Sequence, residues 1–90
     1  METADLKLDG NAIGGLLLAL FGVEMTVSVA TCACCGASGP VAELEVYVRC
    51  PGTVVRCPAC GALLMRIVEG RSRTWIDLRG IRTLEVARAS

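Results

Sequence analysis

The 90-residue sequence predicts a small, mostly β fold of antiparallel strands with one N-terminal α-helix, and three observations lead to it. Two cysteine turns recur with the same internal spacing, apolar and polar residues alternate over much of the chain after residue 25, and a helical apolar stripe precedes that region. This combination is typical of a zinc ribbon, in which strands bring two rubredoxin-like cysteine turns to one ion. We expect one domain over residues 1–90, with a loose lead-in at 1–8, a helix at 9–22 and the ribbon at 25–86.

Both cysteine turns have the pattern Cys-x-x-Cys-Gly, at residues 32–36 and again at residues 57–61. Two thiolates on one tight turn reach the same ion, and the glycine that follows lets the backbone bend back without a Cβ clash. Backbone N–H groups in such a turn also point at the sulfur atoms and spread their negative charge. The predicted metal ligands are Cys32, Cys35, Cys57 and Cys60.

One structural zinc ion is the predicted cofactor, because four thiolates in a closed tetrahedron suit it and no carboxylate or imidazole spacing indicates a harder ion. Cys34 would also form a Cys-x-Cys pair with Cys32, but only the choice of Cys35 repeats the glycine pattern of the second turn. A disulfide, or simply buried cysteines, is the alternative to a metal site.

A chain this short buries a limited core, so a staple such as a metal ion is expected. Structural zinc sites contribute about 10–16 kcal/mol of apparent binding free energy, comparable to the net stability of a whole domain. We therefore expect the metal-free chain to be largely unfolded.

The N-terminal region argues against secretion and against a membrane span. A signal peptide needs a positively charged start, whereas acidic residues outnumber Lys7 before the apolar run at residues 13–23. That run is also too short to cross a bilayer. A reducing cytoplasm is the expected compartment for paired free thiols.

The helix at residues 9–22 follows from its stripe and its two ends. Asp9 is the expected N-cap, with Asn11 as the alternative, and Gly22 is the expected C-cap. The apolar stripe repeats at i, i+3, i+4, i+7 and i+8. It consists of Ile13, Leu16, Leu17, Leu20 and Phe21.

Two alternating runs follow the helix. Residues 25–31 place Met25, Val27 and Val29 on one side and are expected to form a strand leading into the first cysteine turn. The second run, at residues 42–50, is expected to form a strand with an apolar core face and a solvated face. The core face holds Ala42, Leu44, Val46, Val48 and Cys50, and the solvated face holds Glu43, Glu45, Tyr47 and Arg49.

The second run is expected to pair with residues 53–57 as a hairpin that delivers the chain to the second cysteine turn. Pro51 and Gly52 fit the central positions of a type II turn over residues 50–53. Further strands are expected at 62–69 and 73–78, joined by a turn at 70–72.

The C-terminal part contains the only tryptophan, Trp75, which we expect to cap the core. Residues 81–89 fit both a helical stripe and a strand face, and an extended segment is favoured.

Composition bears on the class of function. The chain has no histidine, which removes the commonest general base, and no glycine-rich phosphate loop. Glu43 and Glu45 share one strand face but are expected to be solvated rather than catalytic. We therefore predict no enzyme activity and expect a module that presents a surface to another macromolecule.

Short segments spread along the chain carry a resemblance to a known family. They are Leu8–Ala12, Met25-Thr26, Pro51-Gly52, Arg56–Pro58 and Trp75–Gly80. The chain resembles a family of small, uncharacterised zinc-ribbon-like proteins of high-GC, actinobacterial-type bacteria, a domain of unknown function. The resemblance covers residues 8–86 and implies a ribbon with an N-terminal helix, paired cysteines at the four positions named above and no assigned activity.

Two other classes of function compete with an interaction module. The second cysteine turn is similar to the iron-binding turns of rubredoxin, which suggests electron transfer, because thiolate ligation alone does not separate zinc from iron. Rubredoxins are acidic and aromatic around their iron, whereas this chain is neutral and has one Phe, one Trp and one Tyr. Arginines crowd the second half and suggest nucleic acid, but zero net charge argues against it.

Two thiols lie outside the four-cysteine pattern. Cys34 would sit beside the metal and could be a reactive or switch cysteine, whereas Cys50 falls on the apolar strand face and is expected to be inert.

The last expectation concerns assembly. Hydrophobic residues make up 53% of the chain and charged residues 20%, more apolar surface than a domain this small can hide. Interior glycines leave a face of the helix on which another backbone could approach closely, and exposed strand edges near the C-terminus could pair. The helix face holds Gly14, Gly15, Leu18 and Gly22. We expect a homodimer or a complex with a protein partner that buries this face, and no membrane contact.

Overall fold

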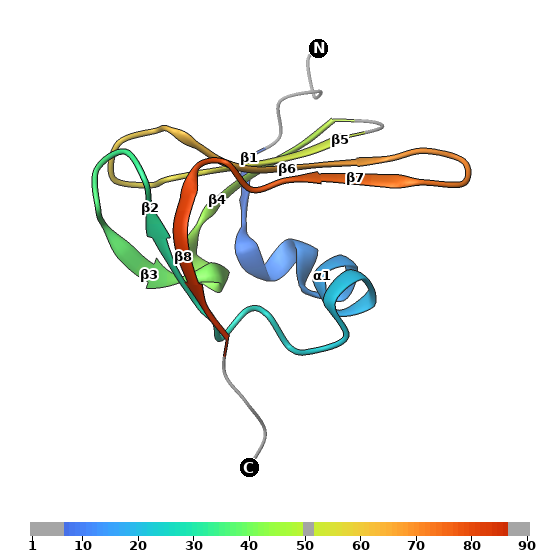
Figure 1. Cartoon of the computed structure of the whole chain (residues 1–90), viewed down its shortest axis with the longest axis horizontal. Helices are drawn as coiled ribbons and strands as arrows, with labels where there is room; N and C mark the ends of the chain where they lie inside the picture. The colour runs from blue at the N-terminus through green and yellow to red at the C-terminus, as the bar shows by residue number, and fades with distance from the viewer. Residues whose placement is uncertain (1–6, 50–51, 87–90) are drawn as a thin grey trace.

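The structure is a computed structural model and describes residues 7–49 and 52–86 (Figure 1). The elements in chain order are β1 (Lys7–Asp9), the 3-10 helix η2 (Gly10–Ile13), α1 (Gly14–Phe21), β2 (Val29–Cys32), β3 (Ser38–Pro40), the 3-10 helix η3 (Val41–Glu43), β4 (Glu45–Arg49), β5 (Gly52–Arg56), β6 (Leu63–Glu69), β7 (Thr74–Asp77) and β8 (Ile81–Glu85). The fold is therefore mostly β with one short N-terminal α-helix, as the sequence predicts.

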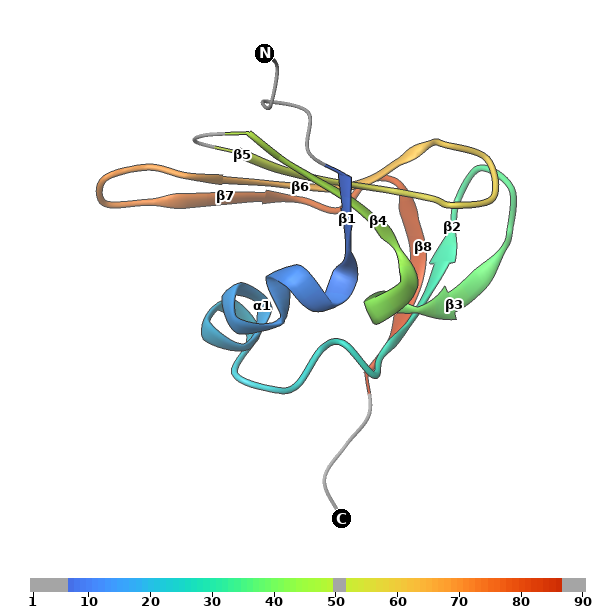
Figure 2. The ribbon, with the colours of Figure 1, turned by 180° about the vertical axis from the view of Figure 1, so that it is seen from behind.

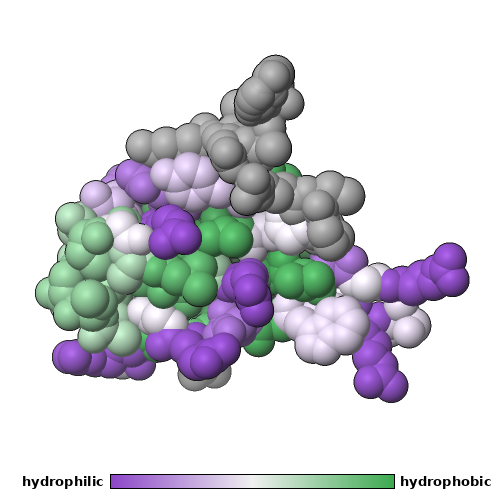
Figure 3. Space-filling model, turned by 90° about the horizontal axis from the view of Figure 1, so that it is seen from above, coloured by the Kyte–Doolittle hydropathy of each residue, from purple (hydrophilic) through white to green (hydrophobic). Residues whose placement is uncertain are grey.

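The strands form two antiparallel sheets. The larger sheet has the order β1-β4-β5-β6-β7, and the smaller sheet has the order β3-β2-β8. Helix α1 lies against one face of the larger sheet (Figures 1 and 2). The smaller sheet lies on the same side, at the end of the larger sheet where the cysteine turns are found. Among the described elements, none covers the opposite face of the larger sheet, which we call the open face. Charged and apolar side chains are mixed on that face (Figure 3).

The core lies between α1 and the two sheets. Ile13 and Leu17 enter it from the helical segment, and Val46, Val55 and Ile67 enter from the inner face of the larger sheet with no exposed surface. Each such side chain contributes about 1.5–3 kcal/mol by leaving water. The remaining buried hydrophobic residues are Met25, Ala30, Cys32, Val41, Leu44, Cys57, Leu64 and Met65.

Gly22 is confirmed as the C-cap of the predicted helix, but the α-helix begins only at Gly14, and Asp9 caps the 3-10 helix η2 that precedes it. The carboxylate of Asp9 accepts a hydrogen bond from the Asn11 N–H at 3.1 Å, and Gly22 ends α1 with φ 77°. At Gly10 the chain passes so close to Val41 that an added Cβ would lie 1.7 Å from its carbonyl oxygen. Just before it, Leu8 pairs with Val46, so Lys7–Asp9 form a strand that the sequence did not predict.

The predicted strand at residues 25–31 is wrong in its first half. The Ser28 N–H donates to the Met25 carbonyl at 3.0 Å and closes a turn, so β2 begins only at Val29. Val27, which the alternation places on the same side as Met25, is 60% exposed, whereas Met25 and Ser28 are both buried. A turn of four residues reverses the faces that strict alternation would assign.

The predicted hairpin is confirmed, because β4 and β5 pair from Glu45 opposite Arg56 to Arg49 opposite Gly52. The prediction that Val48 lies in the core is wrong, because this side chain is 40% exposed. Within the described residues β1 pairs with β4 only as far as Tyr47, so Val48 lies beyond the end of that edge strand. Residues 42 and 43 lie in η3 rather than in the strand. Cys50 and Pro51, with the type II turn expected there, lie outside the described residues.

The strands predicted at 62–69 and 73–78 correspond to β6 and β7, and the extended segment after residue 80 is β8. Residues 87–89 lie outside the described part. Trp75 does not cap the core, because its side chain is 57% exposed. The register explains this: Ile76 pairs with the fully buried Ile67, so the next residue along, Trp75, lies on the open face.

Candidate metal centre

The two cysteine turns have the same backbone geometry. In each, the N–H of the glycine donates to the carbonyl of the first cysteine, at 3.0 Å for Gly36 and 2.8 Å for Gly61. The N–H of that first cysteine donates to the residue after the glycine, at 2.9 Å in both turns. Gly36 and Gly61 have φ of 80° and 79°, a conformation that favours glycine and explains its place in the pattern.

The four predicted ligands meet at one point. The Sγ atoms of Cys32, Cys35, Cys57 and Cys60 all lie within 4.8 Å of one another. Across the two turns, the Cys32 and Cys60 Sγ atoms are 3.7 Å apart, and so are those of Cys35 and Cys57. A tetrahedral ion with metal–sulfur bonds of about 2.3 Å needs sulfur–sulfur separations of about 3.8 Å. The cluster therefore has the dimensions of a four-thiolate metal site.

The first cysteine of each turn is buried and the second is exposed. Cys32 ends β2 and is 1% exposed, and Cys57 follows β5 and is 3% exposed. Cys35 and Cys60 lie in the turns themselves and are exposed. The site thus closes toward the core and opens toward solvent on the side of the two turns.

Backbone donors already polarise the buried sulfur atoms. The N–H groups of Cys34 and Cys35 point at the Cys32 Sγ at 3.3 and 3.5 Å, and the Ala59 N–H points at the Cys57 Sγ at 3.4 Å. The Cys35 N–H in particular, against some burial, lowers the pKa of the Cys32 thiol to about 6. At Cys32 these donors favour the thiolate that a metal needs.

Crowding acts in the opposite direction on the exposed thiols. The Ala62 backbone lowers the pKa of Cys60, but partial burial and the neighbouring Cys35, Cys32 and Cys57 thiols outweigh it and raise that pKa to about 12. The Cys35 pKa is likewise raised, because burial and the nearby Cys57 and Cys32 thiols outweigh the Ala37 backbone. Four thiols at this spacing cannot all ionise unless a cation compensates their charge.

Sequence reasoning missed two residues that support the site. Arg56, one of the arginines that crowd the second half of the chain, donates from Nη1 to the Gly61 carbonyl at 3.0 Å and places a positive charge beside the second turn. Gly80 accepts the Ala33 N–H at 2.9 Å and donates to the Leu64 carbonyl at 3.2 Å, so it ties the first cysteine turn to β6. An added Cβ at Gly80 would lie 1.8 Å from the Leu63 carbonyl oxygen. No local pattern marks Gly80, because its partners Ala33 and Leu64 are distant in sequence, whereas Arg56 reaches a carbonyl only five residues along the chain.

The other residues that the sequence singled out are not among the four grouped ligands. Cys34 is exposed and its thiol is not among the four grouped sulfur atoms, and Cys50 lies outside the described residues. Glu43 is exposed, and the Tyr47 hydroxyl donates to Glu45 at 3.4 Å. Asp77 accepts hydrogen bonds from Arg79, the closest at 2.7 Å, which lowers the pKa of its carboxyl to about 2.

The fold and the cysteine cluster define the class: a small antiparallel β protein of zinc-ribbon type, with two cysteine turns that could hold one metal ion. The chain belongs to a family of unknown function, DUF6510, whose model matches residues 2–89. Comparison with curated proteins gives no match, and comparison with solved structures gives none. None of the helices in the described part of the chain has the length and apolar character needed to cross a bilayer.

Proposed function

We propose that this protein is a zinc-binding, non-enzymatic module whose four-cysteine site is structural and whose surface binds another protein. The single observation that carries the metal proposal is the grouping of the four Sγ atoms within 4.8 Å of one another, with two separations of 3.7 Å between sulfur atoms of different turns. The cluster joins β2, which belongs to the smaller sheet, to β5, which belongs to the larger one. An ion there cross-links the two sheets.

Metal analysis of the purified protein tests this part. We expect one zinc per chain, lost in Cys35→Ser and kept in Cys34→Ser. The control is closely matched, because the two cysteines are adjacent in one turn and both are exposed. Equal metal content in the two variants would contradict the ligand assignment.

Iron is the alternative ion, and the exposure of Cys35 and Cys60 is the observation that favours it, since electron transfer needs a site close to the surface. One iron per chain, with a visible sulfur-to-iron charge-transfer band that bleaches on reduction, would replace the zinc proposal with an electron-transfer one. Colourless protein with stoichiometric zinc supports the structural role.

The proposal of a protein partner rests on the apolar surface of the described residues. The large hydrophobic side chains that remain exposed are Leu18, Val23, Val27, Val48, Leu63, Trp75, Ile76, Leu78 and Val86. Such exposure in so small a domain favours an interaction surface. A reducing cytoplasm is the compartment in which the four thiols would stay available for metal.

Nucleic acid is a second candidate, favoured by the position of Trp75. The register places Tyr47, Arg66 and Trp75 on the open face, and aromatic side chains beside arginine are the usual platform for single strands. The ion pair with Asp77 neutralises Arg79, and the chain as a whole has zero net charge, so protein is preferred. Quenching of Trp75 fluorescence by a single-stranded oligonucleotide, strongest at low salt, would support the nucleic-acid candidate. Unchanged fluorescence at low salt would exclude it.

A further inference from the structure

The strand edges of this protein differ in how well they are protected. Exposed edges invite pairing with another chain, and proteins usually block them with short strands, charges or proline. Edge strand β1 has three residues with a charge at each end, β3 ends in Pro40, and β8 carries Arg82 and Glu85. Edge strand β7 reads Thr-Trp-Ile-Asp, with a single charge at its end and no lysine or proline. It is the least protected edge among the described strands.

The backbone of β7 offers hydrogen-bonding groups along this edge. The Gly70 N–H donates to the Arg73 carbonyl at 2.8 Å, which makes these two residues the hydrogen-bonded pair that closes the β6–β7 hairpin. Hydrogen-bonded and non-hydrogen-bonded pairs alternate in an antiparallel ladder, so Trp75 and Asp77 bond to β6. Thr74 and Ile76 therefore direct their N–H and C=O groups away from the sheet.

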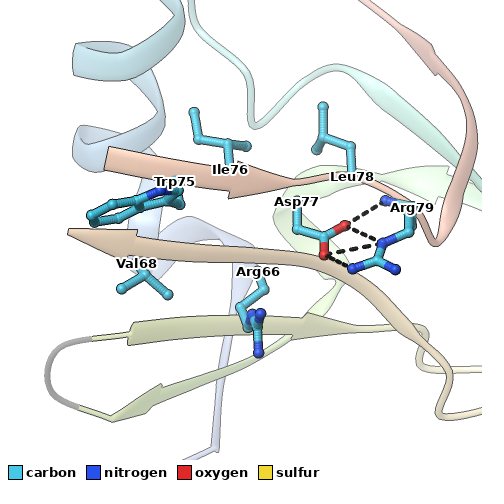
Figure 4. A pocket seen from close by; sticks show the side chains of 7 residues that line it. All are labelled: Arg66, Val68, Trp75, Ile76, Asp77, Leu78 and Arg79. Atoms are coloured by element: carbon cyan, nitrogen blue, oxygen red, sulfur yellow. Dashed lines mark hydrogen bonds and ion pairs between the residues drawn. The ribbon is translucent and has the colours of Figure 1, made fainter. Parts of the chain in front are cut away.

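Apolar side chains flank this edge on both faces. Trp75 is 57% exposed on the open face, and Ile76 and Leu78 are each 38% exposed and point to the other side (Figure 4). A groove of about 560 Å³ runs along β7. It is lined by Arg66, Val68, Trp75, Ile76, Asp77, Leu78 and Arg79. An added strand would satisfy the free backbone groups and cover apolar surface in one step.

We propose that β7 pairs antiparallel with β7 of a second copy of this chain and joins two five-stranded sheets across a two-fold axis. Because such an interface is self-complementary, each residue meets its partner symmetrically about the centre. When the two-fold axis passes beside Trp75, the free backbone groups of Thr74 in one copy pair with those of Ile76 in the other. When the axis passes beside Ile76, the Ile76 residues of the two copies pair. Backbone hydrogen bonding therefore permits both registers.

Charge selects between these two registers. Centring on Trp75 places Arg73 of each copy opposite Asp77 of the other, and stacks the two tryptophans side by side on the open face. Centring on Ile76 instead places Arg73 opposite Arg79 and leaves Trp75 opposite Asp77. Opposite charges and aromatic pairs stabilise cross-strand contacts, and like charges weaken them. The register centred on Trp75 is therefore the one assigned.

This inference rests on the proposed interaction module and names its partner, a second copy. It also places the dimer contact at the edge of β7, and not at the helix face that the sequence suggested. The helix face around Leu18, which is 47% exposed, provides apolar surface but no free backbone groups, because an α-helix bonds its own. The edge of β7 supplies both.

Sedimentation velocity of the metal-loaded protein over a range of concentrations tests the proposal. We expect a monomer–dimer equilibrium that Ile76→Pro abolishes. Proline removes the N–H that faces the edge and leaves the bonds of Trp75 and Asp77 to β6 in place. Leu18→Glu is the matched control on the helix and should leave the dimer intact. Monomer at every concentration, or a dimer broken by Leu18→Glu and kept by Ile76→Pro, overturns the proposal.

A charge exchange tests the register. Arg73→Asp alone and Asp77→Arg alone should each raise the dimer dissociation constant about tenfold, because like charges then face each other twice. The double variant should restore it. Since Trp75 is the only tryptophan, an exciton couplet in the far-ultraviolet circular dichroism should appear with dimerisation and vanish on dilution.

Failure to rescue by the double variant, in a protein with native metal content and melting temperature, overturns the register. Metal content is measured on every sample, so loss of the zinc site is distinguished from loss of the dimer.

Discussion

The two ends of the larger sheet are held together in different ways. At one end the β5–β6 connection forms the second cysteine turn and lies beside the first turn, which follows β2. At the other end the β6–β7 hairpin projects over α1 with an exposed edge (Figure 1). A metal ion can cross-link the first end, whereas the second depends on apolar packing and backbone pairing. The proposed metal cross-link and the proposed association through β7 therefore lie at opposite ends of the larger sheet.

Removing the metal should have the largest effect. A strong chelator should unfold the chain cooperatively, because about 10–16 kcal/mol of binding free energy exceeds what a core this small supplies. Circular dichroism before and after chelation, with zinc added back, measures this. Retention of the native spectrum in the metal-free state would show that the packed end sustains the fold by itself.

The next largest effect is expected at the contact that ties the first cysteine turn to the larger sheet. Gly80→Ala should destabilise the metal-loaded protein by about 3 kcal/mol or more, because its Cβ would collide with the backbone of Leu63. Gly39→Ala is the control, because nothing lies within 4 Å of the added Cβ. Thermal melts of the two variants measure the difference. Equal melting temperatures would mean that the backbone around Gly80 and Leu63 can shift to accommodate the added Cβ at little cost.

Replacing a glycine in the helix at the packed end should increase the free energy of unfolding. Gly15→Ala should stabilise the protein by about 0.5–1 kcal/mol, since alanine is the better helix former and the added Cβ meets open space. Gly14→Ala should gain less, because its Cβ would lie 3.2 Å from the Thr26 methyl group. Chemical denaturation of both variants compares them. Destabilisation by Gly15→Ala would point to a surface packed against that face of the helix.

The smallest effect is expected at the Asp77–Arg79 pair beside the exposed edge. Arg79 lowers the pKa of Asp77 from 3.8 to about 2, so the native state favours the ionised carboxylate. The stabilisation is therefore fully present above about pH 4 and is lost as the pH falls toward 2. In Arg79→Gln the Asp77 pKa should rise toward its ordinary value, as a carboxyl chemical-shift titration would show. An unchanged midpoint would mean that Arg79 does not hold this carboxylate in solution.

The sequence by itself determined the features that depend on neighbouring residues. The four grouped cysteines lie on two short turns whose spacing and glycines are a local pattern, and the β4–β5 hairpin follows from alternation on either side of one turn. Both ends of the helical segment, Asp9 and Gly22, were readable because a cap acts within one turn of the chain. Such features were predictable because they need no knowledge of the remaining structure.

The tertiary structure decided what each surface meets. Trp75 was expected in the core, but the register pairs Ile76 with Ile67 and leaves the tryptophan outside. Met25 and Ser28 close a turn inside an alternating run, because the packing of the neighbouring chain buries them both. Gly10 and Gly80 are required only because another backbone passes within contact distance. The contacts of Gly10 with Val41 and of Gly80 with Leu63 join residues far apart in sequence, so no local pattern encodes them.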